Sequence, residues 1–382
     1  MTDETFTGYV HAMRVHVLAL RDCTTFVPIG YADLLRKSIA LAATLPLARP
    51  PRRVEVSLIS AGKSLEVAGA GGTRVVCDAR LADARKSDLV LVPAVDPDIV
   101  AHLDLNRAVV PWLRRAYLGG ADVASACTGA FLLGEAGILD GKSATTHWAF
   151  QDFFQARYPR VRLQPQAIVV DQGRVVTAGG ATSFLSLSLY LVERIFGAEV
   201  ARAASKMFLV DVNKSPQSAY AIFNTQKTHG DEEILRAQDL LERDVADSPS
   251  VGDLARQVAM SPRNFVRRFQ QATGNSPRDY MQRLRIEVAK RALEGATQPL
   301  SAVAGKVGYR DVVAFRRLFQ RWTGLSPSEY RARYGPHRAP AFSGRARPQA
   351  PSRRPPRAPA RDGRGPGSTP SGLPSARRRQ GR

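Results

Sequence analysis

A basic, aromatic segment occurs twice in this sequence, and no other feature limits the possible folds as strongly. The first copy is Ser261–Pro277 (SPRNFVRRFQQATGNSP), and the second is Asp311–Pro327 (DVVAFRRLFQRWTGLSP), fifty positions further on. Two phenylalanines, a Thr-Gly pair and a Ser-Pro pair recur at the same offsets. Self-similarity at a fixed period is typical of a repeated structural unit, so the two copies predict two units of the same fold.

Each copy follows a short segment with apolar residues at helical spacing. These residues are Val251, Leu254, Ala255 and Val258 before the first copy and Leu300, Val303, Ala304 and Val307 before the second. A short helix, a tight turn and a second helix with phenylalanine inward and arginine outward form a helix-turn-helix pattern. Between the copies, residues 278–296 have the apolar stripe of one long amphipathic helix. Such a helix is expected to hold two recognition helices in successive major grooves of DNA.

Residues 231–335 resemble the DNA-binding domain of the AraC/XylS regulator family. The closing segment FRRLFQRWTGLSPSEYRARYG carries the signature of that family, and both helix-turn-helix units are present. The resemblance implies an all-α domain of seven helices in a sequence-specific transcription regulator. It also implies double-stranded promoter DNA as a partner, and RNA polymerase as a second partner if the protein is an activator.

The residues expected to touch DNA follow from which side of each recognition helix faces away from the phenylalanines. They are Arg263, Val266, Arg267 and Arg268 in the first unit and Arg310, Val312, Val313, Ala314, Arg316 and Arg317 in the second. Arginine can pair with guanine through two hydrogen bonds, and small apolar side chains can meet the thymine methyl group. Arg268, Arg310 and Arg321 are expected at phosphates instead. For any one arginine, a solvated position remains the alternative.

The N-terminal half has a different pattern, in which short β-branched runs alternate with helical segments. The first four predicted strands are Met13–Leu20, Arg53–Ser60, Ser87–Val95 and Ala121–Cys127, and the predicted helical segments are Tyr31–Leu45 and Asp98–Gly120. Residues 174–197 predict a later strand, a Gly-Gly turn and a further apolar helix. This alternation predicts an α/β fold with a mostly parallel sheet and helices on both faces. Binding sites in such folds lie at the carboxyl ends of the strands.

One strand runs directly into a helix through Ala126–Ala130 (ACTGA), which is the pattern of a nucleophile elbow with Cys127 at the turn. His147 follows twenty residues later in SATTHW. These motifs resemble the PfpI-type branch of the class I glutamine amidotransferase-like superfamily over residues 13–210, which implies a flavodoxin-like sandwich. Some members of that branch are cysteine-dependent hydrolases or deglycases. Others are fused to AraC-type domains and sense amino acids or amines.

The resemblance also indicates which catalytic parts to look for. A partner carboxylate would lie at Val27, and a Gly-Gly source of an oxyanion donor would lie at Ala94-Val95. With both replaced, we predict a sensor with no catalytic residues, no cofactor and no metal, whose ligand pocket includes Cys127, Thr128 and His147. Two alternatives remain open: a cysteine-dependent hydrolase or deglycase with a DNA-binding module, and a constitutive architectural DNA-binding protein.

The predicted organisation is a sensor domain at 13–210, a linker at 211–230, the DNA-binding domain at 231–335 and a disordered tail at 336–382. The tail holds 12 arginines and one acidic residue, and so supplies about half of the formal net charge of +21. Three scattered cysteines and the absence of a long apolar run predict a cytoplasmic protein without a membrane span. A homodimer formed through the sensor domain is an expectation from the resemblance alone.

Overall fold

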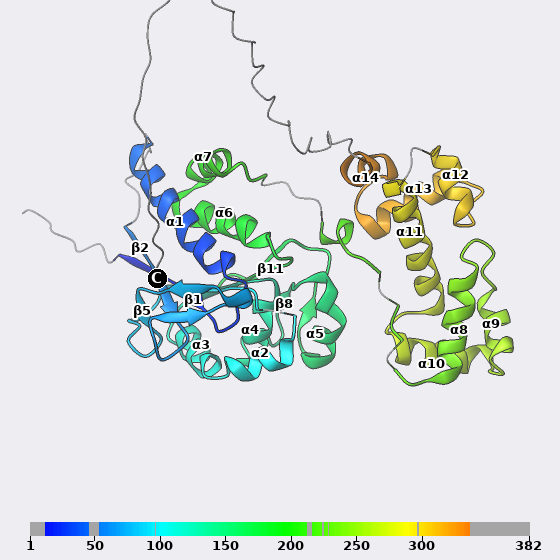
Figure 1. Cartoon of the computed structure of the whole chain (residues 1–382), viewed down its shortest axis with the longest axis horizontal. Helices are drawn as coiled ribbons and strands as arrows, with labels where there is room; N and C mark the ends of the chain where they lie inside the picture. Colours follow the sequence, from blue (N-terminus) through cyan, green and yellow to red (C-terminus); the bar gives the residue numbers. More distant parts are fainter. Residues whose placement is uncertain are drawn as a thin grey trace, which may run out of the picture. The chain divides into compact units, whose positions relative to one another are not determined.

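The computed structural model describes residues 12–45, 53–95, 97–211, 216–223, 225–227, 229–295 and 298–336 (Figure 1). Strands alternate with helices from Met13 to Phe208, and we call this part the α/β domain. From Glu232 to Tyr334 the described elements are all helices, and we call this part the helical domain. The predicted disorder of the arginine-rich tail concerns residues outside the described ranges, and the four predicted domain boundaries stay predictions.

A seven-stranded sheet forms the centre of the α/β domain. Its strands are β1 (Met13–Ala19), β2 (Val54–Ser60), β5 (Ala79–Arg80), β6 (Leu89–Val92), β7 (Asp122–Ala126), β10 (Val169–Asp171) and β11 (Val175–Ala178), in the order β10-β11-β7-β6-β1-β2-β5. Every neighbouring pair is parallel except β10 with β11. The predicted mostly parallel sheet is therefore confirmed, with β1, β2, β6 and β7 at the first four predicted strands and β11 at the later one. The antiparallel edge strand β10 was not predicted.

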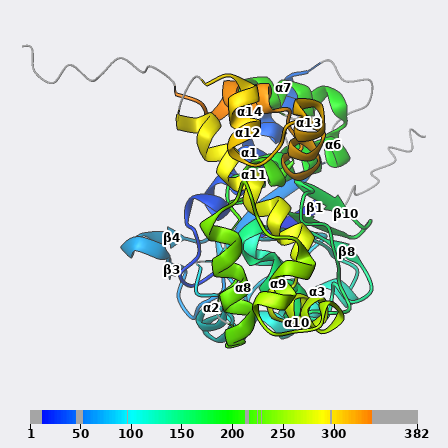
Figure 2. The same cartoon turned by 90° about the vertical axis from the view of Figure 1, so that its right-hand side faces the viewer.

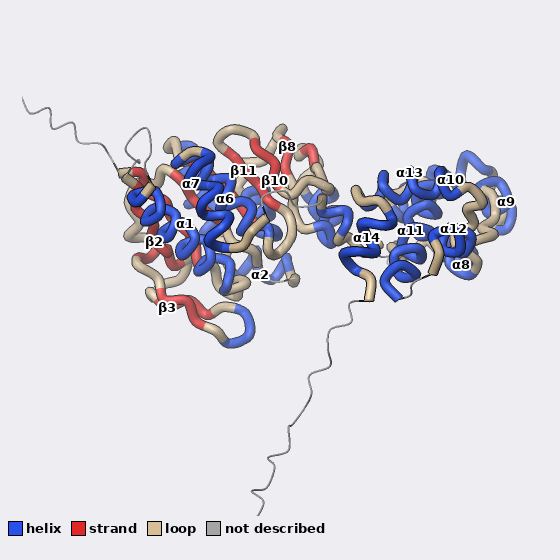
Figure 3. Tube along the Cα trace, turned by 90° about the horizontal axis from the view of Figure 1, so that it is seen from above, coloured by secondary structure: helices blue, strands red, loops and turns tan. Residues whose placement is uncertain are grey.

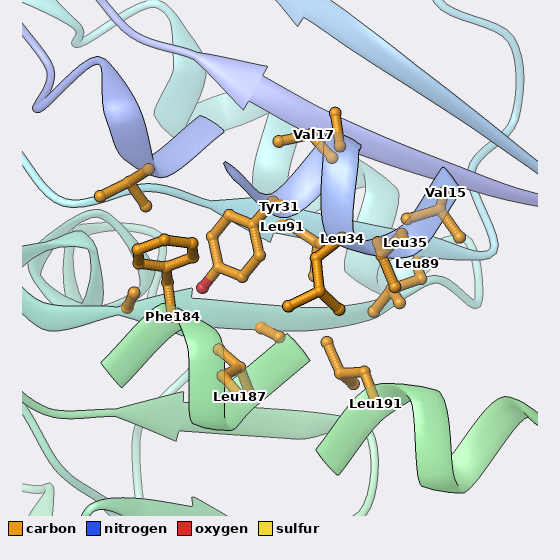
Figure 4. Packing of buried hydrophobic residues seen from close by; sticks show 14 of the residues in the cluster. Val15, Val17, Tyr31, Leu34, Leu35, Leu89, Leu91, Phe184, Leu187 and Leu191 are labelled. Atoms are coloured by element: carbon orange, nitrogen blue, oxygen red, sulfur yellow. The ribbon is translucent and has the colours of Figure 1, made fainter. Parts of the chain in front are cut away.

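Helices cover both faces of this sheet (Figures 1 and 3). One face packs against α1 (Phe26–Thr44), α6 (Ser183–Phe196) and α7 (Ala198–Phe208), and the other against α2 (Ile99–Leu105), α3 (Val109–Leu118) and α4 (Ala130–Glu135). Figure 4 shows the first face, where Tyr31 and Leu34 of α1 and Phe184 and Leu187 of α6 meet the strands. Burial on both faces explains why these strands have continuous apolar runs.

The remaining elements of this domain are small. They are a β3 (Glu66–Ala68)–β4 (Arg74–Val76) hairpin, a parallel pair of β8 (Ser143–Ala144) and β9 (Arg162–Leu163), and α5 (Gln151–Arg157). The predicted helical segment Asp98–Gly120 is two helices, α2 and α3, because Asn106 ends the first. Its buried amide bonds the backbone N–H and C=O of Arg21 at 2.9 and 3.1 Å, and donates to the carbonyl of His102 at 3.0 Å.

The helical domain contains the seven expected helices, which form two separate cores (Figure 2). The helices are α8 (Glu232–Arg243), α9 (Val251–Gln257), α10 (Pro262–Thr273), α11 (Pro277–Gly295), α12 (Leu300–Lys306), α13 (Val312–Thr323) and α14 (Pro327–Tyr334). The long helix α11 belongs to both cores, because Tyr280 packs with α8, α9 and α10 while Ile286 and Leu293 pack with α12, α13 and α14. None of the described helices is long and apolar enough to cross a membrane.

Candidate DNA-binding helices and effector cavity

The two recognition helices α10 and α13 begin and end in the same way. Ser261 accepts a hydrogen bond from the Asn264 N–H at the start of α10, and Asp311 accepts one from the Val313 N–H at the start of α13. Both helices end at a left-handed glycine, Gly274 with φ 70° and Gly324 with φ 74°. Glycine adopts this conformation at low cost, so the repeated Thr-Gly pair fixes where both helices stop.

The predicted DNA-contacting side chains lie on the outer faces of these helices. Arg263 and Arg267 of α10, Arg310 before α13, and Ala314, Arg316 and Arg317 of α13 are exposed, and Val312 is half-buried. Two apolar side chains are also exposed, Val266 at 36% and Val313 at 52%. Each helix thus exposes one valine, at places that do not correspond, since Val266 aligns with Arg316 and Val313 with Arg263. Exposed valines can make the apolar contact that thymine methyl groups offer. Arg321 is exposed and lies over the Trp322 ring, with 5.7 Å from its Cζ to the ring centroid.

Arg268 differs from the other predicted residues because it is paired within the domain, and its expected phosphate contact stays a prediction. Its guanidinium group donates to both carboxylate oxygens of Asp231, at 2.9 and 2.7 Å, and to Glu233 at 2.8 Å. These contacts join α10 to the beginning of α8. A guanidinium group that is already paired with two carboxylates is a structural group of the domain. Helical periodicity could not predict this pairing, because Asp231 lies 37 residues earlier in the chain.

The predicted elbow is present between β7 and α4. Cys127 has φ 57°, a left-handed conformation that is strained for a residue with a side chain. A Cβ atom on Gly129 would lie 2.5 Å from the Pro93 carbonyl oxygen and 2.9 Å from that of Val92. Only glycine fits at that place, so the small residues around Cys127 are required by close contact with the end of β6.

The Cys127 thiol is in an environment that favours its neutral form. It is 5% exposed, and burial raises its pKa to about 11 even though hydrogen bonds from Thr128 oppose the shift. Tyr31 belongs to the same buried cluster, and its hydroxyl has no hydrogen-bond partner among the described residues. Catalytic cysteines have a lowered pKa, because the thiolate is the nucleophile.

Thr128 has a structural role as well as its predicted place in a ligand pocket, which stays a prediction. Its hydroxyl accepts the Val95 N–H at 2.8 Å and donates to the Val95 carbonyl at 2.6 Å. Val95 is at the position predicted for an oxyanion donor, and this N–H is therefore already bonded. Val27, at the position predicted for a partner carboxylate, is fully buried in the same apolar cluster as Cys127.

A cavity of about 200 Å³ lies beside His147, and neither Cys127 nor Thr128 lines it. Its walls are His147, Trp148, Ile168, the segment Gly179–Ser183, Gln217 and Tyr220. The Gly-Gly turn follows β11 directly, so the cavity is at the carboxyl end of a parallel strand, where binding sites of this fold class are expected. Thr146 connects the elbow to this wall, because its hydroxyl donates to the Cys127 carbonyl at 3.0 Å.

His147 combines an aromatic surface with an uncharged ring. Its Nδ1 accepts the Ala149 N–H at 3.1 Å, and burial lowers its pKa. Its ring centroid is 5.1 Å from that of Trp148. Of the three residues predicted for the pocket, only His147 lines the cavity. The sequence analysis missed Gln217 and Tyr220, which lie in the predicted linker and have no motif to indicate them.

Comparisons with known proteins agree with both parts of this description. Residues 40–194 match the DJ-1/PfpI family, and residues 254–333 match a helix-turn-helix domain family. The HTH-type transcriptional regulator CdhR of Pseudomonas aeruginosa is 28% identical, over 72% of this chain and 81% of CdhR. The regulator GbdR of the same species is 26% identical, over 63% of this chain and 66% of GbdR.

One similar solved structure is that of DJ-1beta of Drosophila melanogaster, with a TM-score of 0.44 and 20% identity over 53% of this chain and all of that one. The family matches confirm the two predicted resemblances. The chain carries a DJ-1/PfpI-type domain with a mostly parallel sheet and an AraC-type helix-turn-helix domain.

Proposed function

We propose that this chain, a transcriptional regulator with a DJ-1/PfpI-type domain, reads promoter DNA with α10 and α13 and senses a small metabolite in the cavity beside His147. The proposed metabolite class is an amino acid or an amine. The observation that carries the proposal is the pair of recognition helices with equivalent ends and exposed basic and apolar faces, both packed on one shared helix.

The shared helix α11 supports simultaneous reading of two sites on DNA. It has 19 residues, and at 1.5 Å per residue its length is about 28 Å. One turn of DNA is about 34 Å, so helices packed at the two ends of α11 suit neighbouring major grooves on one side of the duplex. Arg263 and Arg267 would act in the first groove, and Arg316 and Arg317 in the second.

The size and lining of the cavity support the proposed metabolite class. A volume of about 200 Å³ is below the roughly 300–1,000 Å³ of pockets for drug-sized ligands, and suits a molecule of amino-acid size. The His147 and Trp148 rings belong to the cavity lining, and aromatic rings attract cations. The neutral His147 ring adds no positive charge that would repel one.

Signalling requires that the metabolite binds one arrangement of the protein more tightly than another. The proposal includes a homodimer formed through the α/β domain and, for an activator, contact with RNA polymerase. It also includes a cytoplasmic location, where a DNA-binding regulator meets its promoter. A catalytic role for Cys127 is opposed by the raised pKa of its thiol and by the bonded Val95 N–H.

The DNA-binding part is tested by selecting binding sites from random duplexes with the full chain and mapping the protected bases. Arg267→Ala and Arg317→Ala are each expected to cost about 1–3 kcal/mol of binding free energy at the selected site. The matched control is Arg202→Ala, an exposed arginine of α7. A variant with both Arg267→Ala and Arg317→Ala that still protects the selected bases at physiological salt would contradict the proposal.

The sensing part is tested by thermal shift with amino acids and amines. A ligand at 100 times its Kd adds about 2.7 kcal/mol to stability, which is readily measured. His147→Phe should reduce the shift, because it removes the polar atoms of the ring and keeps its packing. A broad panel without any shift would count against an effector site, whatever the result of the DNA selection.

A further inference from the structure

The cavity wall includes two polar side chains from outside the α/β domain, those of Tyr220 and Gln217 in the predicted linker. Gln217 is the more deeply buried of the two. It begins the 3-10 turn η4 (Gln217–Ala219) and is 2% exposed. We propose that Gln217 is an effector-contacting residue, that the occupant of the cavity donates an N–H to its Oε1 atom, and that the linker thereby reports whether the cavity is filled. This inference rests on the proposed effector role of the cavity.

Hydrogen bonds fix the orientation of the Gln217 amide. Its Nε2 atom lies 3.0 Å from the Thr145 hydroxyl, 3.1 Å from the Thr146 carbonyl, 2.9 Å from the Ala167 carbonyl and 3.4 Å from the Pro165 carbonyl. Carbonyl oxygens only accept hydrogen bonds, so the NH2 end of the amide must face them. The Gln217 backbone N–H adds a bond of 3.0 Å to the Gln166 carbonyl.

The other end of the amide is unsatisfied. Oε1 is buried and has no hydrogen-bond partner in the part of the chain that the structure describes. A buried carbonyl oxygen without a donor is destabilising, and a donor brought by a ligand would remove that cost. An ammonium or amine N–H is such a donor, whereas a fully N-methylated nitrogen has none. The unsatisfied atom therefore favours a primary or secondary amine within the proposed class.

The Gly-Gly turn is shaped around this side chain. A Cβ atom on Gly179 would lie 1.8 Å from Nε2 and 2.5 Å from Oε1 of Gln217, and one on Gly180 would lie 3.9 Å from Oε1. Both glycines line the cavity together with Gln217. The conformation of the turn and the position of the amide thus depend on each other, so a ligand that moves one must move the other.

The same linker segment is also bonded to the helix that the two helix-turn-helix units share. Lys290 of α11 donates to the Ala221 carbonyl, and the Phe223 N–H donates to Glu287 of α11 at 3.2 Å. Lys290 and Glu287 are a buried ion pair, with 2.9 Å between Nζ and Oε2. Between Gln217 and Ala221 there are only three residues. A change at the amide is therefore expected to reach α11 through the backbone.

The experiment uses matched pairs of single-nitrogen probes that differ only in N-methylation: ethanolamine with choline, and glycine, β-alanine and 4-aminobutyrate each with its N-trimethyl derivative. Binding to the full chain is measured by thermal shift and calorimetry. At least one N–H member is expected to bind, and its permethylated partner is expected to bind about tenfold more weakly, the size of one well-formed hydrogen bond. Equal binding within every pair that binds would overturn the inference.

Two variants separate the hydrogen bond from ligand size. Gln217→Met keeps the length of the side chain and removes the amide, so it should abolish the preference for the N–H member. Gln155→Met is the control, because Gln155 is an exposed glutamine with a single carbonyl bond of 3.2 Å. A preference that persists in Gln217→Met would show that size alone decides and would overturn the inference.

A measurement on the unaltered protein covers the case in which Gln217→Met does not fold. Hydrogen exchange of residues 216–223 should slow when the N–H probe is added, and should not change with its permethylated partner at equal concentration. Unchanged exchange with a bound N–H probe would contradict the inference. If only compounds without N–H bind, the cavity is still an effector site but Gln217 does not contact the effector as proposed. If no compound binds, both the effector site and the role of Gln217 are contradicted.

Discussion

The Thr128 hydroxyl bonds both backbone polar groups of Val95, accepting its N–H at 2.8 Å and donating to its carbonyl at 2.6 Å. In acyl-transfer enzymes, free N–H groups at an elbow stabilise the oxyanion. In this protein the Val95 N–H is not free, because it donates to the hydroxyl of Thr128, a residue of the elbow itself. The strained turn at Cys127 therefore joins the end of β7 to the segment after β6, and the room for a ligand is at the neighbouring Gly-Gly turn.

We predict that Thr128→Val destabilises the α/β domain by about 1–3 kcal/mol, because the shape of the side chain is kept while two buried backbone groups lose their partner. Urea denaturation followed by circular dichroism would measure the change. Thr44→Val is the control, since Thr44 is exposed and bonds only the Leu41 carbonyl. Equal effects of the two substitutions would contradict the structural role of Thr128.

The Cys127 thiol should react slowly with iodoacetamide at pH 7.5. With a pKa of about 11 it is protonated, and the thiolate is the reactive form. Because folding raises this pKa above its ordinary value of 9.0, the resulting stability is present below pH 9 and is lost as pH rises toward 11. Peptide mass spectrometry should show labelling that increases with pH and is fast in urea. Fast labelling of the folded protein at pH 7.5 would favour a hydrolase or deglycase instead.

Arg268→Ala and Arg263→Ala should affect different properties. The first should lower the melting temperature of the helical domain, because it leaves Asp231 and Glu233 without their partner, and should change the salt dependence of DNA binding little. If Arg263 meets a phosphate, Arg263→Ala should reduce the slope of the logarithm of the DNA-binding constant against the logarithm of salt concentration by about 1. If Arg263 meets a base, the substitution should lower selectivity at one base pair. Binding titrations at several salt concentrations distinguish these cases. A reduced slope for Arg268→Ala would instead support its expected phosphate contact.

The turns of the two helix-turn-helix units have different residues at their left-handed position, alanine in the first and glycine in the second. Exchanging these residues should change the stability of the helical domain in opposite directions. Ala259 has φ 54° and Gly308 has φ 79° at corresponding places. Ala259→Gly should stabilise the helical domain by about 1 kcal/mol, since the left-handed conformation is costly for alanine. Gly308→Ala should destabilise it by more, because its Cβ would also lie 2.2 Å from the Ala246 carbonyl oxygen. Denaturation curves of both variants would check the two signs.

Local patterns in the sequence predicted most of the fold, because they depend on neighbours along the chain. The repeat around Phe265 and Phe315 predicted both helix-turn-helix units, and the apolar runs predicted four adjacent strands of the sheet. The antiparallel edge strand β10 has only three residues and a single partner strand. Such a short segment has no periodicity that would distinguish it from a loop.

The site was less predictable, since it depends on residues brought together by folding. The sequence gives Cys127 a reactive motif, yet the neutral state of its thiol follows from burial beside Tyr31. The paired state of Arg268 follows from Asp231 across the domain. Gln217 lies in a polar segment without a motif, and its position follows from acceptors at Thr145, Thr146 and Ala167. The motif around His147 and the Gly-Gly pair at 179–180 were the local signals near the cavity.

The membership of α11 in both cores has a consequence for the operator. If the two recognition helices read DNA as proposed, the spacing between the two contacted grooves is set by one continuous helix, α11, which has no hinge. Inserting five base pairs between the two contacted elements would rotate one of them to the opposite side of the duplex, beyond the reach of a single chain. Promoters recognised in this way must therefore keep the phase of their two elements more strictly than any one of their bases.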